Sequence, residues 1–245
     1  TMMSQVKAIS GATGQEFDDL TAKAQEMGAT TKFTATESAE AFNYMAMAGW
    51  KPQQMIDGIS GIMSLAAASG EDLGTTSDIV TDALTAFGLQ AGDAGHFADV
   101  LAQASANANT NVSMLGESFK YVAPVAGAMN YSVEDTSLAL GLMANASIKG
   151  SMAGTALKTS LANMAAPTDS MAAAMDKYGI SLTDSEGNMK SLRGVIDNLR
   201  GSLGGLSETE QTAAASTIFG KEAMAGMLAI INASEEDYNK LSTAI

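Results

Sequence analysis

The sequence contains no cysteine, only three prolines, one tryptophan and one histidine among its 245 residues. Without cysteine the chain has no disulfide and no thiolate for catalysis or metal binding, so packing alone must hold the fold. Three prolines are few for an all-β or loop-dominated protein of this length. Because aromatic residues make up only 5% of the chain, its apolar content is mostly alanine, leucine, isoleucine and methionine, which favours helices in close contact.

Basic residues are scarce as well, with 13 Lys+Arg against 27 Asp+Glu and a formal net charge of −14. This charge repels phosphate backbones, and the basic residues are scattered singly, so we expect no specific nucleic-acid binding. No apolar run reaches the ~18–20 residues that cross a bilayer, and the first residues do not resemble a signal peptide. We expect a soluble segment that is a fragment of a longer protein.

The sequence offers no set of residues typical of an active site. His96 is the only histidine, and no nucleophile-elbow motif accompanies it, so a surface or capping role is favoured. Asp184, Glu186 and Asn188 alternate like the start of a calcium loop, but Met189 stands where that loop requires glycine. Pairs of acids lie in first helical turns, where capping explains them. We therefore predict no catalytic, cofactor-binding or metal-binding residue and no enzyme activity.

Helix-start signals recur along the chain, each a hydroxyl residue followed three positions later by an acid. Glycines such as Gly28, Gly49 and Gly88 are expected to end helices, and Pro124 to kink or break one. The predicted capping pairs are Thr13/Glu16, Thr34/Glu37, Ser69/Asp72, Ser132/Asp135, Ser207/Glu210 and Ser234/Asp237.

The resulting fold class is mainly α: a compact multi-helix bundle of short helices. One small β-hairpin is expected near residues 180–192, where two short arms flank the turn Asp184–Asn188. We divide the chain into a helical core, residues 1–166, and a helical continuation, residues 167–245, packed on the same core. Residues 37–49 and 135–147 are weakly similar, which either an old helical-hairpin duplication or compositional bias explains; compositional bias is favoured.

The chain is organised around residues 144–158, ANASIKGSMAGTALK. They are interpreted as the end of one helix, a glycine-containing bend and the start of a second helix that packs closely on its neighbours. Small residues at almost every position indicate architecture or a place for a partner's helix. The candidate packing positions of the whole chain are Gly49, Trp50, Pro124, Gly150, Gly154 and Thr155.

Several short elements, taken together, resemble the conserved core region of the tail tape-measure proteins of tailed bacteriophages. They are EFDDL at 16–20, GATTKFTATESAEA at 28–41, MAGW at 47–50, APVA at 123–126, IKG at 148–150, AGTALK at 153–158 and FG at 219–220. No single element is chemically specific. The resemblance depends on their common order and spacing over nearly the whole chain.

This resemblance implies a structural virion protein, encoded by a phage or prophage, that sets tail length, nucleates tail-tube assembly and takes part in DNA delivery. It implies a place in the virion tail lumen, several copies per tail, and contacts with the tail tube protein, tail assembly chaperones and tail-tip or distal tail proteins. Contact with the host membrane after ejection is a further implication.

The frequent glycine and proline interruptions bear on which part of such a protein this segment is. A rod that sets tail length as one continuous helix lengthens by about 1.5 Å per residue, whereas this segment should fold back on itself. We therefore expect a docking or channel-associated module and not the ruler rod. A helical membrane-active or protein-interaction domain is the main alternative, and a cell-wall hydrolase is a remote one.

Overall fold

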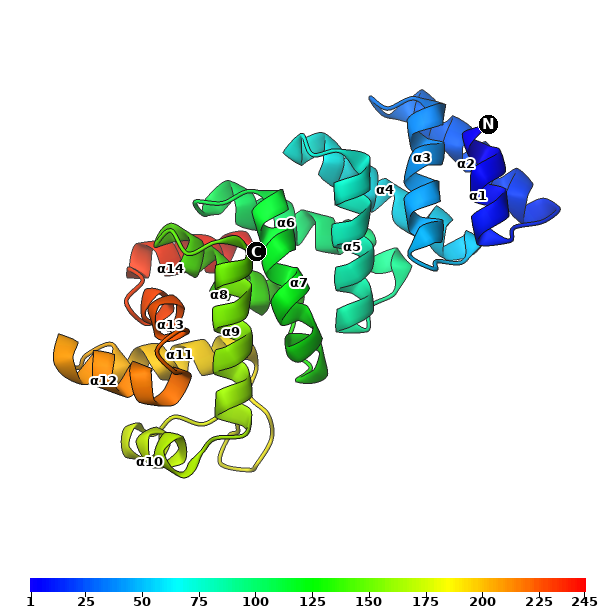
Figure 1. Ribbon diagram of the computed structural model, residues 1–245. Coiled ribbons are helices and arrows are strands. Elements are labelled where there is room, and N and C mark those ends of the chain that lie inside the picture. Colours follow the sequence, from blue (N-terminus) through cyan, green and yellow to red (C-terminus); the bar gives the residue numbers. More distant parts are fainter. The chain divides into compact units, whose positions relative to one another are not determined.

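A computed structural model describes residues 1–245, and its regular structure is entirely helical (Figure 1). The all-α prediction is confirmed. The elements are α1 Met2–Ser10, α2 Gln15–Thr30, α3 Ala35–Met47, α4 Pro52–Ser69, α5 Leu73–Phe87, the 3-10 turn η1 Ala91–Asp93, α6 Ala94–Asn107, α7 Val112–Ala128, α8 Val133–Asn145, α9 Gly150–Ala165, α10 Asp169–Tyr178, α11 Leu192–Leu203, α12 Glu208–Phe219, α13 Met224–Ile231 and α14 Glu235–Ala244.

The helices form two compact units, Thr1–Ala102 and Gln103–Ile245. The predicted division at residue 166 lies inside the second unit, where α9 contacts both α10 and α12. Residues 167–245 therefore pack on helices that precede them. The two-part domain description stays a prediction.

In the first unit, α3 is the central helix. It contacts α1, α2, α4 and α5, while α4 also packs on η1. Its apolar face carries Phe42 and Met45, which are fully buried, and α4 contributes Met55, Ile59 and Ile62 to the same interior. Helical spacing places these side chains on one face of each helix, so burying that face stabilises the unit.

In the second unit, α8 is the most enclosed element and has ten buried residues in its 13. It contacts α7, α9, α11, α13 and α14. Phe119 of α7, Phe219 of α12, and Leu138 and Met143 of α8 are nearly or fully buried. A helix that is apolar nearly all round must be covered on every side, which explains why so many helices surround α8.

The local capping signals set most helix starts. Thr34 with Glu37, and Ser207 with Glu210, form reciprocal capping boxes, and Ser132 and Ser234 each accept the expected backbone N–H. Two predicted pairs are wrong, because Gly14 and Asp72 occupy the N-cap positions of α2 and α5. The acid Asp72 caps α5 directly with its own carboxylate, which accepts the Thr75 N–H.

The predicted β-hairpin near residues 180–192 is wrong, because the chain contains no β-strand. A single antiparallel bridge joins Thr183 to Met189 within an irregular loop between α10 and α11. Two backbone hydrogen bonds join the two arms: Asp184 N–H donates to the Asn188 carbonyl and Lys190 N–H to the Leu182 carbonyl, each at 2.8 Å. Side chains satisfy further groups of the loop, since the Asp184 carboxylate accepts N–H groups from Glu186 and Asn188. These bonds, led by that of Asn188, hold the pKa of Asp184 below its ordinary value.

The helix end predicted at Gly28 is wrong, and of the kink or break predicted at Pro124 the break does not occur. Gly28 lies inside α2, where a β-carbon would come within 2.5 Å of the Ala35 nitrogen, so its role is close packing and not helix termination. Helix α7 runs from Val112 to Ala128 with Pro124 inside it, so Pro124 does not break it. Proline has no backbone N–H, so the carbonyl group four residues before it lacks its usual donor in the helix. Because Pro124 is exposed, it lies on the side of α7 that faces water, where water can bind this carbonyl.

Candidate functional site

The segment 144–158 forms a tight corner between α8 and α9. Helix α8 ends at Asn145, and Ser147 then takes a left-handed conformation with φ 67°. This turn directs the Ile148 N–H to the Met143 carbonyl at 3.0 Å, a closure typical of helix C-termini. Lys149 is the N-cap of α9, which begins at Gly150.

Backbones meet directly where α9 crosses α7. A β-carbon at Gly154 would lie 2.3 Å from the Ser118 carbonyl oxygen, a distance that real side chains do not reach. The Ser118 hydroxyl also donates a hydrogen bond to the Gly150 carbonyl oxygen at 2.7 Å. Glycine at 154 therefore lets the two helices approach until the Ser118 side chain binds a main-chain carbonyl of the other helix.

The six candidate packing positions are divided between the two units. Gly150, Gly154 and Thr155 lie on α9, and Pro124 lies on α7 in the same unit. Gly49 and Trp50 follow α3 in the first unit. There Gly49 has φ 86°, and the Trp50 N–H closes the helix end on the Met45 carbonyl at 3.1 Å.

A surface groove of about 300 Å³ lies beside α9 in the second unit. Its wall on α9 consists mainly of Met152, Thr155, Ala156 and Thr159, and Ile148 closes one end. The opposite wall, just before and at the start of α13, consists of Glu222, Ala223, Ala225 and Gly226. Met152 is 68% exposed, an unusual position for a large apolar side chain. The groove is absent from the sequence-based prediction, because it forms between segments about seventy residues apart.

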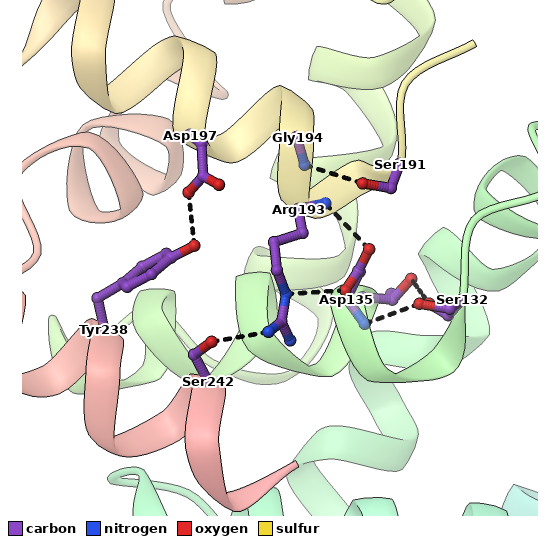
Figure 2. A network of polar contacts seen from close by, with 9 residues as sticks. Ser132, Asp135, Ser191, Arg193, Gly194, Asp197, Tyr238 and Ser242 are labelled. Atoms are coloured by element: carbon purple, nitrogen blue, oxygen red, sulfur yellow. Dashed lines mark hydrogen bonds and ion pairs between the residues drawn. The ribbon is translucent and has the colours of Figure 1, made fainter.

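A polar network holds α8, α11 and α14 together (Figure 2). The Asp135 carboxylate accepts the Arg193 backbone N–H at 3.0 Å and its Nε–H at 3.1 Å. The same guanidinium donates to the Ser242 hydroxyl at 2.7 Å. Tyr238 donates to Asp197, and burial, followed by this carboxylate, raises the pKa of Tyr238 to about 12. These donors and acceptors satisfy one another, so the role of the network is to link α8, α11 and α14.

The structure contains no group of three or more histidine, cysteine, aspartate or glutamate residues that could hold a metal ion. His96 lies exposed on α6. None of the helices has both the length and the apolar character required to span a membrane. The groove beside α9 is a surface depression with a large exposed apolar side chain, Met152, on its wall.

Comparison with known proteins identifies the family of the chain. The profile of the family described as phage-related minor tail protein matches residues 21–220. A tape measure protein of Pneumococcus phage Dp-1 is 41% identical over 99% of this chain and 21% of its own length. A probable tape measure protein of Escherichia phage P2 is 26% identical over 98% of this chain and 30% of its own length.

No solved structure matches the chain. The chain spans 21% and 30% of the lengths of those two relatives, so it corresponds to one segment of each. The match covers both helical units and includes the α8–α9 corner. The chain therefore belongs to the phage minor tail protein family, the tape measure proteins of bacteriophage tails.

Proposed function

We propose that this segment is a docking or channel-associated module of a tape measure protein and adds little to the tail length that the protein sets. The observation that carries the proposal is the shortness of the helices. The longest, α4, has 18 residues and so extends about 27 Å. A continuous helix of all 245 residues would extend about 370 Å.

The compactness of each of the two units is a second observation that supports the proposed docking function. For chains of the lengths of these two units, the expected radius of gyration is about 13–15 Å. A compact folded unit has a defined surface that another protein can bind. The groove beside α9, with the exposed Met152, is part of such a surface. The surfaces would meet the tail tube protein, tail assembly chaperones or tail-tip proteins, and further copies of the chain within the tail lumen.

The acidic balance is compatible with a place along the route of DNA delivery. With a net charge of −14, the segment repels DNA phosphates, so passing DNA would not adhere to it. Contact with the host membrane after ejection would then be made by other regions or by a refolded form, since no helix here is suited to span a bilayer.

An in-frame deletion of these 245 residues from the complete gene tests the proposal. We expect failure of tail assembly or of DNA delivery, scored by electron microscopy and by plaque formation. The control is a deletion of equal length elsewhere in the same protein that shortens tails and keeps the particles infectious. Viable particles whose tails are shortened by about 1.5 Å per residue removed would show that the segment is part of the ruler rod.

The alternative functions have direct assays with the purified segment. Release of a dye from liposomes would favour the membrane-active alternative, and clearing of a peptidoglycan gel would favour the cell-wall hydrolase. We expect neither result, because the apolar helix faces are buried in the two units and no cluster of residues suited to hold a catalytic metal ion is present.

A further inference from the structure

Helix α14 covers part of the central helix α8, but a single buried side chain anchors it there. Of its ten residues only Leu241 is buried, and it is buried fully. The Leu241 side chain lies over Gly141 of α8, where a β-carbon would come within 2.4 Å of the leucine Cδ2. Gly141 thus forms a notch that holds one leucine. By comparison, α11 buries five residues, among them Leu199 and Leu203.

Polar contacts complete the attachment of α14, and one stripe of α11 provides them (Figure 2). The residues of that stripe are four and three positions apart, so they share a helix face, and each contacts a residue of α14. The pairs, with the α11 residue first, are Arg193–Ser242, Asp197–Tyr238 and Arg200–Glu235. The Arg200 guanidinium also lies 4.8 Å from the centre of the Tyr238 ring. Two polar stripes therefore face each other between α11 and α14.

The contact between α11 and α14 is open to water. A hollow of about 480 Å³ lies between the two helices, and Arg200, Gly201 and Glu235 are among the residues that line it. The Glu235 side chain is 82% exposed. Exposed ion pairs hold their partners weakly, and salt screens them. Along α11, helix α14 therefore has neither close packing nor a strong ionic bond.

The link that precedes α14 is held independently of the helix. Helix α13 ends at Ile231, and Ser234 is the N-cap of α14. The Arg200 Nη1 group donates to the carbonyl oxygens of Ile230 and Ala233, at 2.8 and 2.9 Å. These bonds fix the end of α13 and most of the link. Movement of α14 can therefore begin at Ser234 without disturbing α13.

We propose that α14 is a strap that opens from α8 and α11 as one piece while the rest of the second unit stays folded. A segment opens locally where few apolar contacts hold it and where water reaches its polar contacts. Opening uncovers the notch at Gly141, so the strap controls whether this part of the most enclosed helix faces solvent. The ionic contacts with α11 set how often the strap opens. This inference does not depend on the docking function proposed above.

Hydrogen exchange of the whole chain, measured by mass spectrometry of peptic peptides, tests the opening. The exchange is followed in increasing urea below the unfolding transition. Opening of α14 alone exposes little surface, so its exchange should depend weakly on urea, whereas exchange of α8 should accelerate steeply. Without urea we expect α14 to exchange at least about a hundredfold faster than α8. The same rate and the same urea dependence for both helices would overturn the proposal.

Salt separates an ionic strap from simple fraying of a helix. Between about 0.01 M and about 1 M NaCl the screening length falls from about 30 Å to about 3 Å. Exchange in α14 should accelerate about threefold, as expected for the loss of one exposed ion pair. The control is α1, the first helix, which has nine residues, one buried side chain and Lys7 as its only charged residue. An equal acceleration in α1, or none in α14, would refute the ionic attachment.

Two neighbouring acids provide matched charge variants. Glu235→Gln removes the ion pair with Arg200 and should accelerate exchange in α14 about threefold at low salt. Glu236→Gln removes the same charge from the same helical turn, and Glu236 is likewise exposed. Both variants lose a similar interaction with the helix dipole, so the difference between them reports the ion pair. Equal exchange rates in the two variants would contradict the role of that pair.

Leu241→Ala tests the apolar anchor. Loss of the only buried side chain of α14 should accelerate its exchange at least about tenfold. The strap predicts that α9 keeps the protection that it has in the parent chain. If α9 loses protection to the same extent, or if the variant does not fold, α14 belongs to the core of the second unit and the proposal is wrong.

Discussion

Replacing Gly154 by alanine should destabilise the second unit, although alanine is the better helix former. In a helix interior this exchange ordinarily gains about 0.5–1 kcal/mol. Here the new β-carbon would lie 2.3 Å from the Ser118 carbonyl oxygen, a backbone atom that cannot rotate away. Helices α7 and α9 must therefore separate, which costs about 3 kcal/mol for overpacking and loosens the Ser118–Gly150 hydrogen bond. We expect a net loss of about 2 kcal/mol.

Gly201→Ala is the matched control within the same unit. Gly201 lies inside α11 and is exposed. Apart from its own helix backbone and chain neighbours, no atom lies within 4 Å of the position that a β-carbon would take there. Alanine at 201 should therefore raise the free energy of unfolding by about 0.5–1 kcal/mol. Urea unfolding followed by far-ultraviolet circular dichroism measures both variants. Trp50 is the only tryptophan and lies in the first unit, so its fluorescence transition should not move. Equal stability of the Gly154 and Gly201 variants would refute the argument from close approach.

Three further predictions concern other contacts. Hydrogen bonds from the Thr34 N–H, and then from its hydroxyl, hold the pKa of Glu37 below its ordinary 4.5. The ionised Glu37 therefore stabilises the folded first unit above pH 4.5, and this stabilisation is lost as the pH falls through the lower pKa of the folded state. Glu37→Gln should flatten the acid side of the curve of unfolding free energy against pH, measured by Trp50 fluorescence in urea. Asp135→Asn and Arg193→Met should each lower the free energy of unfolding of the second unit by about 1–3 kcal/mol. Additive effects in a double-mutant cycle would show that the two side chains are not coupled. Gly58→Ala should displace the Trp50 ring and shift its emission to longer wavelength; an unchanged spectrum would contradict the packing of that ring on Gly58.

The helix starts could be predicted because their causes are local. Ser207 and Glu210 satisfy each other's backbone N–H groups within one turn, and α12 begins where that signal places it. The same holds for Thr34 and Glu37 at α3. These interactions need no distant partner, so a short window of sequence contains all the information that they require.

The prediction that Gly28 ends a helix failed because the role of this residue depends on its contact with another helix. Gly88 ends α5 in a left-handed conformation with φ 66°, whereas Gly28 continues α2, where the Ala35 backbone packs against it. The two glycines look alike in the sequence. The loop around Asp184 resembles a hairpin in sequence, and two backbone hydrogen bonds do join its arms, but the Glu186 and Ser181 N–H groups bind the side chains of Asp184 and Asn198, and no strand forms.

By itself, the sequence determined the helical class, most helix starts and the tape-measure family, because capping, periodicity and composition act over a few residues and recur in relatives. Only the tertiary structure decided which glycines serve close packing, where α7 meets α9, and which residues of α9 and of the start of α13 line a groove. Those features arise where segments far apart in the chain pack together, and the fit between such segments depends on volumes and distances that no local pattern records.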